Sequence, residues 1–217
     1  MRCAVMWSGG KDSALAADRA RRNGAEIACL VNFYDEATGR VRFHATRTEL
    51  IAAQADAMAV PLVQRGTAWH RFDGAFGDTL DELVRDGIDG IVFGDIHLAD
   101  VRAWYETRVR AAGLTHVEPL WGEDPGELLA EFVATGGRAV VTCCESEKLD
   151  DSWLGRVIDE RFVGEIAALP IDPCGENGEY HSFAFAGPLF TRPVPYALGE
   201  RRSDGRFVQL DLVSGRC

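Results

Sequence analysis

Apolar runs alternate with helix-like segments along the first two thirds of the chain. Short, nearly continuous apolar runs indicate buried strands, and between them apolar residues recur at intervals of three and four, which indicates helices. Strands are predicted at 3–7, 26–33, from 61 onward and at 90–93, and helices at 12–22, 50–58, 76–84 and 101–112. Alternation of this kind predicts an α/β fold in which helices cover both faces of a parallel sheet.

The pattern changes after Pro119. Helices are predicted at 126–134 and, as a longer apolar stripe, at 153–166, with strands at 138–144, 182–185 and 207–213. The last of these alternates in the manner of an antiparallel pair. From Pro170 onward Pro and Gly are frequent and the apolar runs are short. We therefore predict two domains, residues 1–118 and a smaller α+β domain over 119–217.

The segment Ser8-Gly9-Gly10-Lys11-Asp12-Ser13 lies between the first predicted strand and the first predicted helix. A strand that turns into a helix presents backbone N–H groups at the positive end of the helix dipole, which suits a phosphate. The two glycines permit close backbone approach, Lys11 adds a positive charge, and Ser8 and Ser13 add hydroxyls. These features predict a phosphate-binding loop.

The type of loop follows from its spacing. A Walker A loop would need Gly at the place of Val5 and Ser or Thr at the place of Asp12, and the Rossmann glycine spacing is absent as well. The motif instead resembles the PP-loop of the ATP pyrophosphatase superfamily. That resemblance implies cleavage of ATP between its α and β phosphates, with Ser8 to Ser13 holding the nucleotide.

Composition narrows the classes of partner. The 217 residues carry a formal net charge of −11, which argues against nucleic acid, because phosphate backbones favour clustered Lys and Arg. No apolar stretch approaches the roughly 18 residues of a membrane span, and the segment before the loop is too short for a signal peptide. Six cysteines without a C-x-x-C pair predict no zinc site or disulfide framework. A cytoplasmic protein is expected.

A second polar constellation occupies residues 173–182. Glu176 and Glu179 could hold magnesium, orient an amine or exchange protons, and His181 suits proton transfer near neutral pH. Taken alone, the segment is more typical of a solvated polar turn between a helix and a strand, and the phosphate-loop motif is what favours chemistry here. Cys174 beside it has two interpretations, a small side chain in a tight turn or a nucleophile.

Together the two segments resemble the diphthine–ammonia ligase family of the PP-loop superfamily. The resemblance rests on residues 8–13, 43–46, 94–96, 118–121 and 175–182. It implies a Rossmann-like HUP-type ATP-binding domain that faces a second domain across a cleft. The implied reaction adenylates a carboxylate with ATP and Mg²⁺, and ammonia then displaces AMP.

The resemblance also implies site residues. Glu176, Glu179 and His181 are expected to be catalytic, Asp12 to help hold the metal, and His44, Asp95, Tyr180 and Ser182 to contact the substrate. His181 stands where eukaryotic and archaeal members typically have Glu, and the Gly94-Asp95-Ile96 segment resembles the bacterial form. The acceptor is therefore expected to be a different carboxylate, on a small metabolite or a protein side chain.

Two alternatives remain open at this point. A tRNA-modifying PP-loop enzyme would share the loop, but thiolation usually needs a cysteine pair that this sequence lacks. A sensor that binds ATP or AMP without turnover would not need the acidic residues at 176–181. The sequence names neither the acceptor nor the oligomeric state, and a homo-oligomer is compatible with it.

Overall fold

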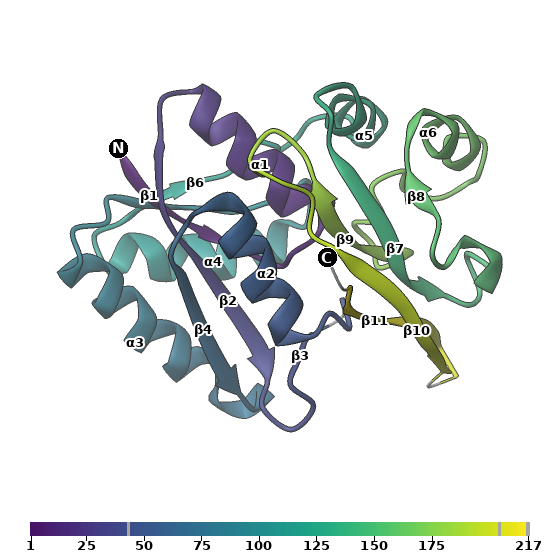
Figure 1. Cartoon of the computed structure of the whole chain (residues 1–217). Coiled ribbons are helices and arrows are strands. Elements are labelled where there is room, and N and C mark those ends of the chain that lie inside the picture. The colour runs from purple at the N-terminus through teal and green to yellow at the C-terminus, as the bar shows by residue number, and fades with distance from the viewer. Residues whose placement is uncertain (43, 204, 216–217) are drawn as a thin grey trace.

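The computed structural model describes residues 1–42, 44–203 and 205–215 and contains two β-sheets (Figure 1). The first sheet is mostly parallel, in the order β4-β2-β1-β5-β6, and the short β3 pairs antiparallel with the end of β2. Its strands are β1 (Arg2–Met6), β2 (Glu26–Asp35), β3 (Arg40–Val41), β4 (Leu62–Thr67), β5 (Gly90–Val92) and β6 (Thr115–Val117).

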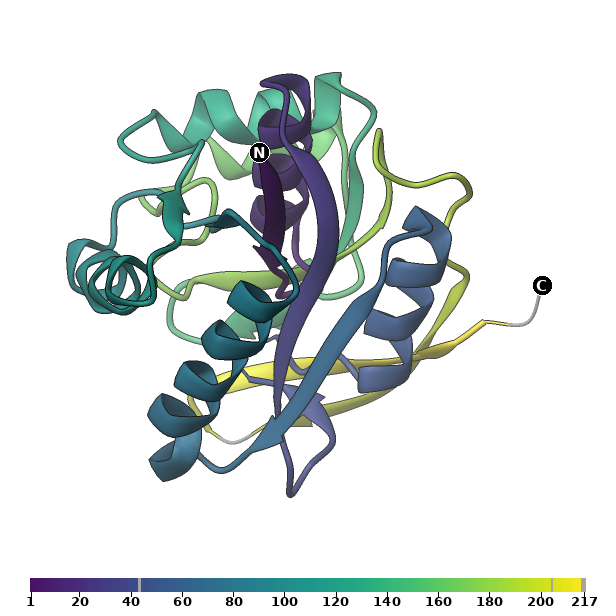
Figure 2. The same ribbon diagram turned by 90° about the vertical axis from the view of Figure 1, so that its left-hand side faces the viewer.

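Helices cover both faces of this sheet (Figure 2). Successive residues of a strand point to opposite faces. In β1, Cys3 and Val5 pack with α1 (Lys11–Arg22) and α2 (Thr48–Met58). Ala4 packs on the other face with α3 (Phe72–Arg85) and α4 (Ala99–Ala111). The α/β prediction is confirmed, because both faces of β1 are buried as a parallel sheet requires.

The second sheet is antiparallel and is centred on β7 (Arg138–Glu145). One side of β7 pairs with β9 (Tyr180–Ala186). Strand β7 also pairs with β8 (Val157–Ile158) and β11 (Phe207–Ser214), and β10 (Tyr196–Ser203) pairs with β11. The remaining elements are the helices α5 (Pro125–Ala134) and α6 (Glu160–Ile166). The predicted strands at 182–185 and 207–213 are confirmed.

One hydrophobic core joins the two sheets. Leu15 of α1 and Leu50 of α2 belong to the same buried cluster as Val140 of β7 and Phe183 of β9. Helix α1 thus packs on the first sheet and also contacts β9 of the second. Since the phosphate-loop motif lies at the start of α1, this packing places the motif where the two sheets meet.

The long helix predicted at 153–166 is wrong. The segment instead forms a 3-10 turn (Asp151–Trp153), strand β8 and the short helix α6. Gly155 has a φ of +79°, which ends helical geometry, and Asp159 starts α6 by accepting a hydrogen bond from the Phe162 amide at 2.9 Å. The apolar stripe is therefore split between strand and helix, and Val157 is exposed.

Strand β10 was not predicted, because it lies at the edge of its sheet and carries Glu200, Arg201 and Arg202 on exposed positions.

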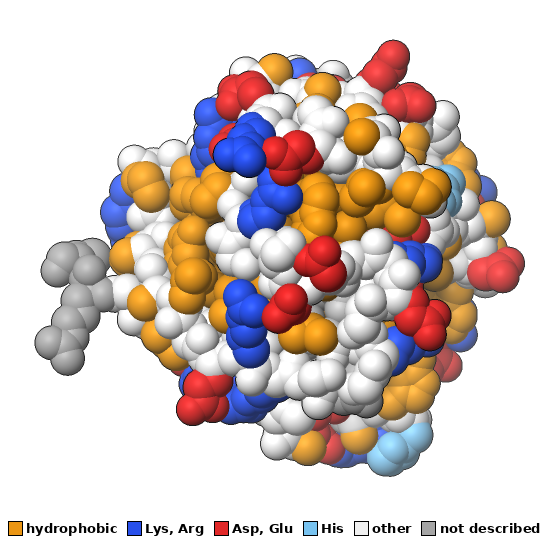
Figure 3. All heavy atoms as spheres, turned by 90° about the vertical axis from the view of Figure 1, so that its right-hand side faces the viewer, with side chains coloured by type: hydrophobic (Ala, Val, Ile, Leu, Met, Phe, Trp, Pro, Cys, Tyr) orange, Lys and Arg blue, Asp and Glu red, His pale blue; other side chains and the backbone are white. Residues whose placement is uncertain are grey.

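On the side of the molecule that lies to the right in Figure 1, acidic and basic side chains are interspersed with apolar ones (Figure 3). Within the described residues, no helix combines the length and the apolarity that crossing a bilayer requires.

Candidate functional site

The loop from Ser8 to Ser13 connects β1 to α1 at the carboxyl end of β1, the edge at which parallel α/β sheets bind ligands. Gly9 has a φ of +84°, and a Cβ there would meet Ile51 Cδ1 at 2.5 Å. The Ser8 hydroxyl accepts from the Gly10 amide at 3.2 Å and contacts the Ser13 hydroxyl at 3.2 Å. The loop is therefore closed on itself, and only glycine fits at position 9.

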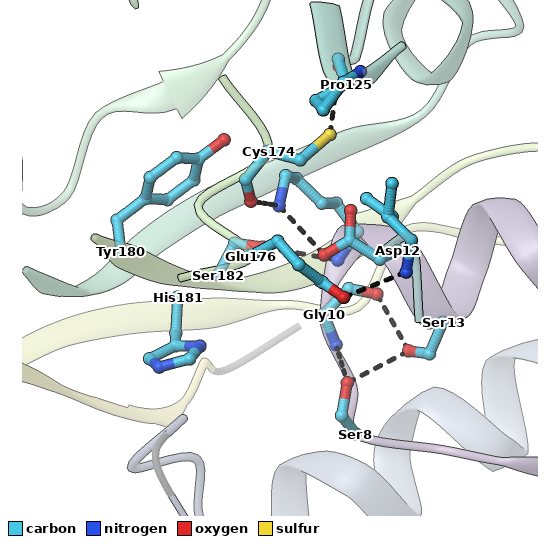
Figure 4. Close-up of polar contacts among 12 residues, drawn as sticks. Ser8, Gly10, Asp12, Ser13, Pro125, Cys174, Glu176, Tyr180, His181 and Ser182 are labelled. Carbon is cyan, nitrogen blue, oxygen red and sulfur yellow. Dashed lines mark hydrogen bonds and ion pairs between the residues drawn. The ribbon is translucent and has the colours of Figure 1, made fainter. Parts of the chain in front are cut away.

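Strand β9 of the second sheet makes two hydrogen bonds with the backbone of the loop. The Gly9 carbonyl accepts from the Ala184 amide at 2.8 Å. The Ser182 hydroxyl accepts from the Lys11 amide at 3.2 Å, which caps α1 in place of a side chain at its own N-cap, Gly10 (Figure 4). Part of the loop's amide N–H capacity is thus already used by protein hydroxyls, and the loop depends on both sheets.

A cavity of about 490 Å³ lies beside the loop. One end is lined by loop residues together with Glu176, His44 and His181. The other end is aromatic, with Phe33, Trp69, Phe72 and Tyr105. Trp69 is 69% exposed and stacks on Phe72, with ring centroids 6.2 Å apart. The cavity therefore combines polar side chains with an aromatic surface, a combination that suits a nucleotide.

The segment that follows α6 brings Glu176 to the polar end of the cavity. Glu176 Oε1 accepts from the Ile96 amide at 2.9 Å, and burial raises the pKa of this carboxyl. Ile96 follows Gly94, where a Cβ would meet the Ser13 amide nitrogen at 2.9 Å. The loop after β5 therefore lies between the phosphate loop and Glu176 and fixes their separation.

Lys11 does not extend into open space. Its side chain is 3% exposed, and its ammonium pairs with Asp12 at 2.9 Å, donates to the Cys174 carbonyl and lies 4.7 Å from the centre of the Tyr180 ring. Although burial opposes it, the charge of Asp12 raises the pKa of Lys11, so the amine stays charged. In this arrangement Lys11 holds the second segment against the loop, and its expected contact with a phosphate stays a prediction.

Two histidines from distant parts of the sequence meet in the cavity. The ring centroids of His44 and His181 are 4.7 Å apart. Burial lowers the pKa of His44 to about 4 and lowers that of His181 well below its ordinary value, so both rings are neutral near pH 7. Thr142 Oγ1 lies within 3.2 Å of both backbone carbonyls. The pair therefore offers hydrogen bonds rather than positive charge.

Asp95 also lines the cavity. Burial and the nearby carboxylates of Glu176 and Glu118 raise its pKa to about 7. Burial likewise raises the pKa of Asp12, although Lys11 opposes that shift. Asp12, Asp95 and Glu176 thus all line the cavity, and the charge of Asp95 changes near neutral pH.

The structure does not bring every predicted residue into the cavity. His44, Asp95, Glu176, Tyr180, His181 and Ser182 line it together with Ser8, Lys11, Asp12 and Ser13, whereas Gly9, Gly10 and Glu179 do not. The Glu179 side chain is 4% exposed, and its Oε1 lies 3.4 Å from Lys148 Nζ. This location favours a structural role, and a catalytic role for Glu179 stays a prediction. Phe43 lies outside the described residues.

Sequence reasoning missed Gln54, a residue of α2 whose side chain binds the backbone of the phosphate loop. Its side-chain amide accepts from the Trp7 indole at 2.8 Å and donates to the carbonyls of Gly9 at 2.9 Å and Ala184 at 2.6 Å. A signal was present, because Gln54 interrupts the apolar face that runs from Leu50 to Met58. The aromatic end of the cavity gave no such signal, since its residues come from separate elements.

Comparison with known families agrees with this geometry. The family model described as the diphthamide synthase N-terminal domain matches residues 1–116, and the diphthamide synthase C-terminal domain matches residues 124–206. The chain belongs to the diphthamide synthase family. Residues from both matched regions line the cavity, so the site lies within the part of the chain that the family models describe.

Relatives within the diphthamide synthase family are distant. The chain is 27% identical to the diphthine–ammonia ligase of Rattus norvegicus and 26% identical to that of Homo sapiens, over 89% of this chain and 82% of each relative. Among solved structures, a predicted tRNA methyltransferase subunit from Methanocaldococcus jannaschii matches with a TM-score of 0.44 and 13% identity, over 65% of this chain and 80% of that one.

Proposed function

We propose that this member of the diphthamide synthase family is an ATP-dependent amide-forming ligase. In the proposed reaction, an acceptor carboxylate attacks the α phosphorus of ATP and pyrophosphate leaves. Ammonia then attacks the acyl carbon, loses a proton, and AMP leaves. The observation that carries the proposal is the placement of the buried carboxyl of Glu176 beside the phosphate loop, in a cavity with an aromatic end.

The chain's own residues fit the steps of this reaction. The aromatic end would stack the adenine, while the loop and the start of α1 would hold the phosphates. Glu176 is our candidate for the group that takes the proton from the attacking nitrogen, because a raised pKa brings a carboxylate closer to ammonia in basicity. The neutral pair His44 and His181 would hydrogen-bond the acceptor. Holding both reactants in one cavity lowers the entropic barrier.

The part of the chain that the structure describes forms no metal centre of its own. Within residues 1–42, 44–203 and 205–215, no three His, Cys, Asp or Glu side chains are grouped as ligands for an ion. Asp12, the expected ligand, is paired with Lys11. Mg²⁺ therefore enters the proposal only as the ion that accompanies ATP, and we assign no step to it.

Conversion of ATP to AMP and pyrophosphate tests the proposal. Purified protein is given ATP, ammonium chloride and either the small-molecule or the protein fraction of a cell extract. We expect pyrophosphate release that requires one fraction and rises with ammonium. ATP binding without AMP formation in either fraction would favour the sensor instead, and AMP formation that ammonium does not stimulate would contradict amidation.

Sulfur transfer is tested at Cys174. Burial raises the pKa of this thiol, and its Sγ donates to the Pro125 carbonyl at 3.1 Å, so it lacks the exposure and low pKa of a nucleophile. We expect Cys174→Ser to keep AMP formation within about threefold of wild type, since a hydroxyl can make the same hydrogen bond. A folded variant that binds ATP but forms no AMP would contradict amidation.

A further inference from the structure

Glu176 lies on a segment that has little regular structure. Residues 167–179, between α6 and β9, form turns, and their backbone hydrogen bonds include Gly175 N to Asp172 O at 2.9 Å and Gly178 N to Gly175 O at 3.0 Å. A carboxylate that must meet a reacting atom needs a firmer support than such turns provide, because small displacements are costly in catalysis.

Contacts with the first sheet supply that support from two directions. On the cavity side, Ile96 donates to Glu176, and Lys11 donates to the Cys174 carbonyl. On the outer side, His97 Nε2 lies 2.6 Å from Asp172 Oδ2. Since His97 follows Ile96 in the chain, the same short loop after β5 holds the segment at two points.

Asp172 couples the outer contact to the cavity. Its carboxylate is 6% exposed, and while Oδ2 faces His97, Oδ1 accepts from the Cys174 amide at 2.7 Å. Neither His97 nor Asp172 lines the cavity. One buried carboxylate therefore links an exposed histidine to the backbone two residues before Glu176.

We propose that His97 and Asp172 form a positioning pair that holds the Glu176 segment against the phosphate loop. Only the expected effect of the pair on turnover rests on the proposed function, whereas its effect on the order of the segment does not. The hydrogen bond to Asp172 raises the pKa of His97, and the carboxylates of Glu176 and Glu179 add to this shift, which favours the charged and stronger form of the contact. The contact of Asp172 with the Cys174 amide then orders the turn that carries Glu176.

The test compares His97→Ala with the rescue variant His97→Gln, whose amide can donate from nearly the same place as Nε2. Hydrogen exchange of peptides over 172–178 is measured first. We expect faster exchange in His97→Ala and near wild-type exchange in His97→Gln. Arg201→Ala, which removes an exposed ion pair to Asp151 at 2.8 Å, is the matched control and should leave this exchange unchanged.

Turnover provides the second readout. With ATP, ammonium chloride and the extract fraction that supports the wild type, His97→Ala should lower the maximal rate of AMP formation by about ten- to a hundredfold, with ATP affinity within about twofold. Unchanged exchange over 172–178 in His97→Ala would overturn the pair, and so would faster exchange with unchanged turnover. A wild-type protein that forms no AMP would overturn the proposed function but not the positioning pair. In that case hydrogen exchange over 172–178 alone decides whether the pair holds the segment.

Discussion

Replacement of Glu176 by Gln is expected to lower AMP formation by a factor of about 100 or more, the range for loss of a positioned acid or base. Gln keeps the acceptor for the Ile96 amide but cannot take a proton. ATP affinity should be unchanged or higher, because a negative charge near the phosphates is removed. Initial rates of pyrophosphate release and calorimetric titration with ATP measure the two quantities separately.

The pH profile strengthens this prediction. Burial raises the pKa of Glu176 above 4.5, so the carboxylate form needed by a base is lost as the pH falls through that raised value. The acidic limb of the wild-type profile should therefore lie above pH 4.5 and should disappear in the Gln variant. Glu179→Gln is the informative comparison, because Glu179 does not line the cavity. Equal losses of turnover in both variants would contradict the assignment to Glu176.

Replacement of Asp211 by Asn is expected to lower the free energy of unfolding by about 3 kcal/mol, the lower end for breaking a buried ion pair. Asp211 lies on β11 and is 6% exposed. Its carboxylate accepts hydrogen bonds from the Arg40 guanidinium at 2.7 Å and from the Arg47 guanidinium at 2.6 and 3.1 Å. Since Arg40 lies on β3 and Arg47 directly precedes α2, these contacts connect the second sheet to both elements. Chemical denaturation at pH 7 measures the loss.

The same prediction has a pH signature. Although burial opposes it, hydrogen bonds from Arg47 and Arg40 hold the pKa of Asp211 well below 3.8. The stabilisation is therefore complete above the unfolded pKa of about 4 and is lost as the pH falls below it. The difference between wild type and Asp211→Asn should shrink over that range. Glu26→Gln, in an exposed pair with Arg2, should change stability by less than about 1 kcal/mol, and an equal loss there would contradict our account of Asp211.

The parallel sheet could be predicted from the sequence because its strands are buried on both faces. A short apolar run such as Cys3 to Trp7, followed directly by the glycines of the loop, is typical of a strand in the interior of such a sheet. Periodicity failed at residues 153–166, where apolar side chains at helical spacing serve a turn, a strand and a short helix in succession. Gly155 and Asp159 were the local signals, and they outweigh the spacing because they fix where a helix can begin.

The site was predictable where its chemistry is contiguous. Residues 8–13 and 175–182 each carry a dense motif, and the structure brings them together. The direction of each side chain was not predictable. Glu176 and Glu179 are three residues apart in one signature, yet one lines the cavity and the other faces Lys148. Such differences depend on turns at Gly175 and Gly178, both with positive φ, and on partners distant in the sequence.

The dependence of the phosphate loop on β9 has a consequence for synthesis of the protein on the ribosome. The Lys11 amide and the Ser182 hydroxyl that caps it are 171 residues apart. At translation rates of about 5–20 residues per second, this separation corresponds to roughly 10–30 s. During that interval the motif has been synthesised, but neither the Ser182 hydroxyl nor the Ala184 amide exists. The nucleotide site is therefore completed only when β9 has been made, long after the loop itself.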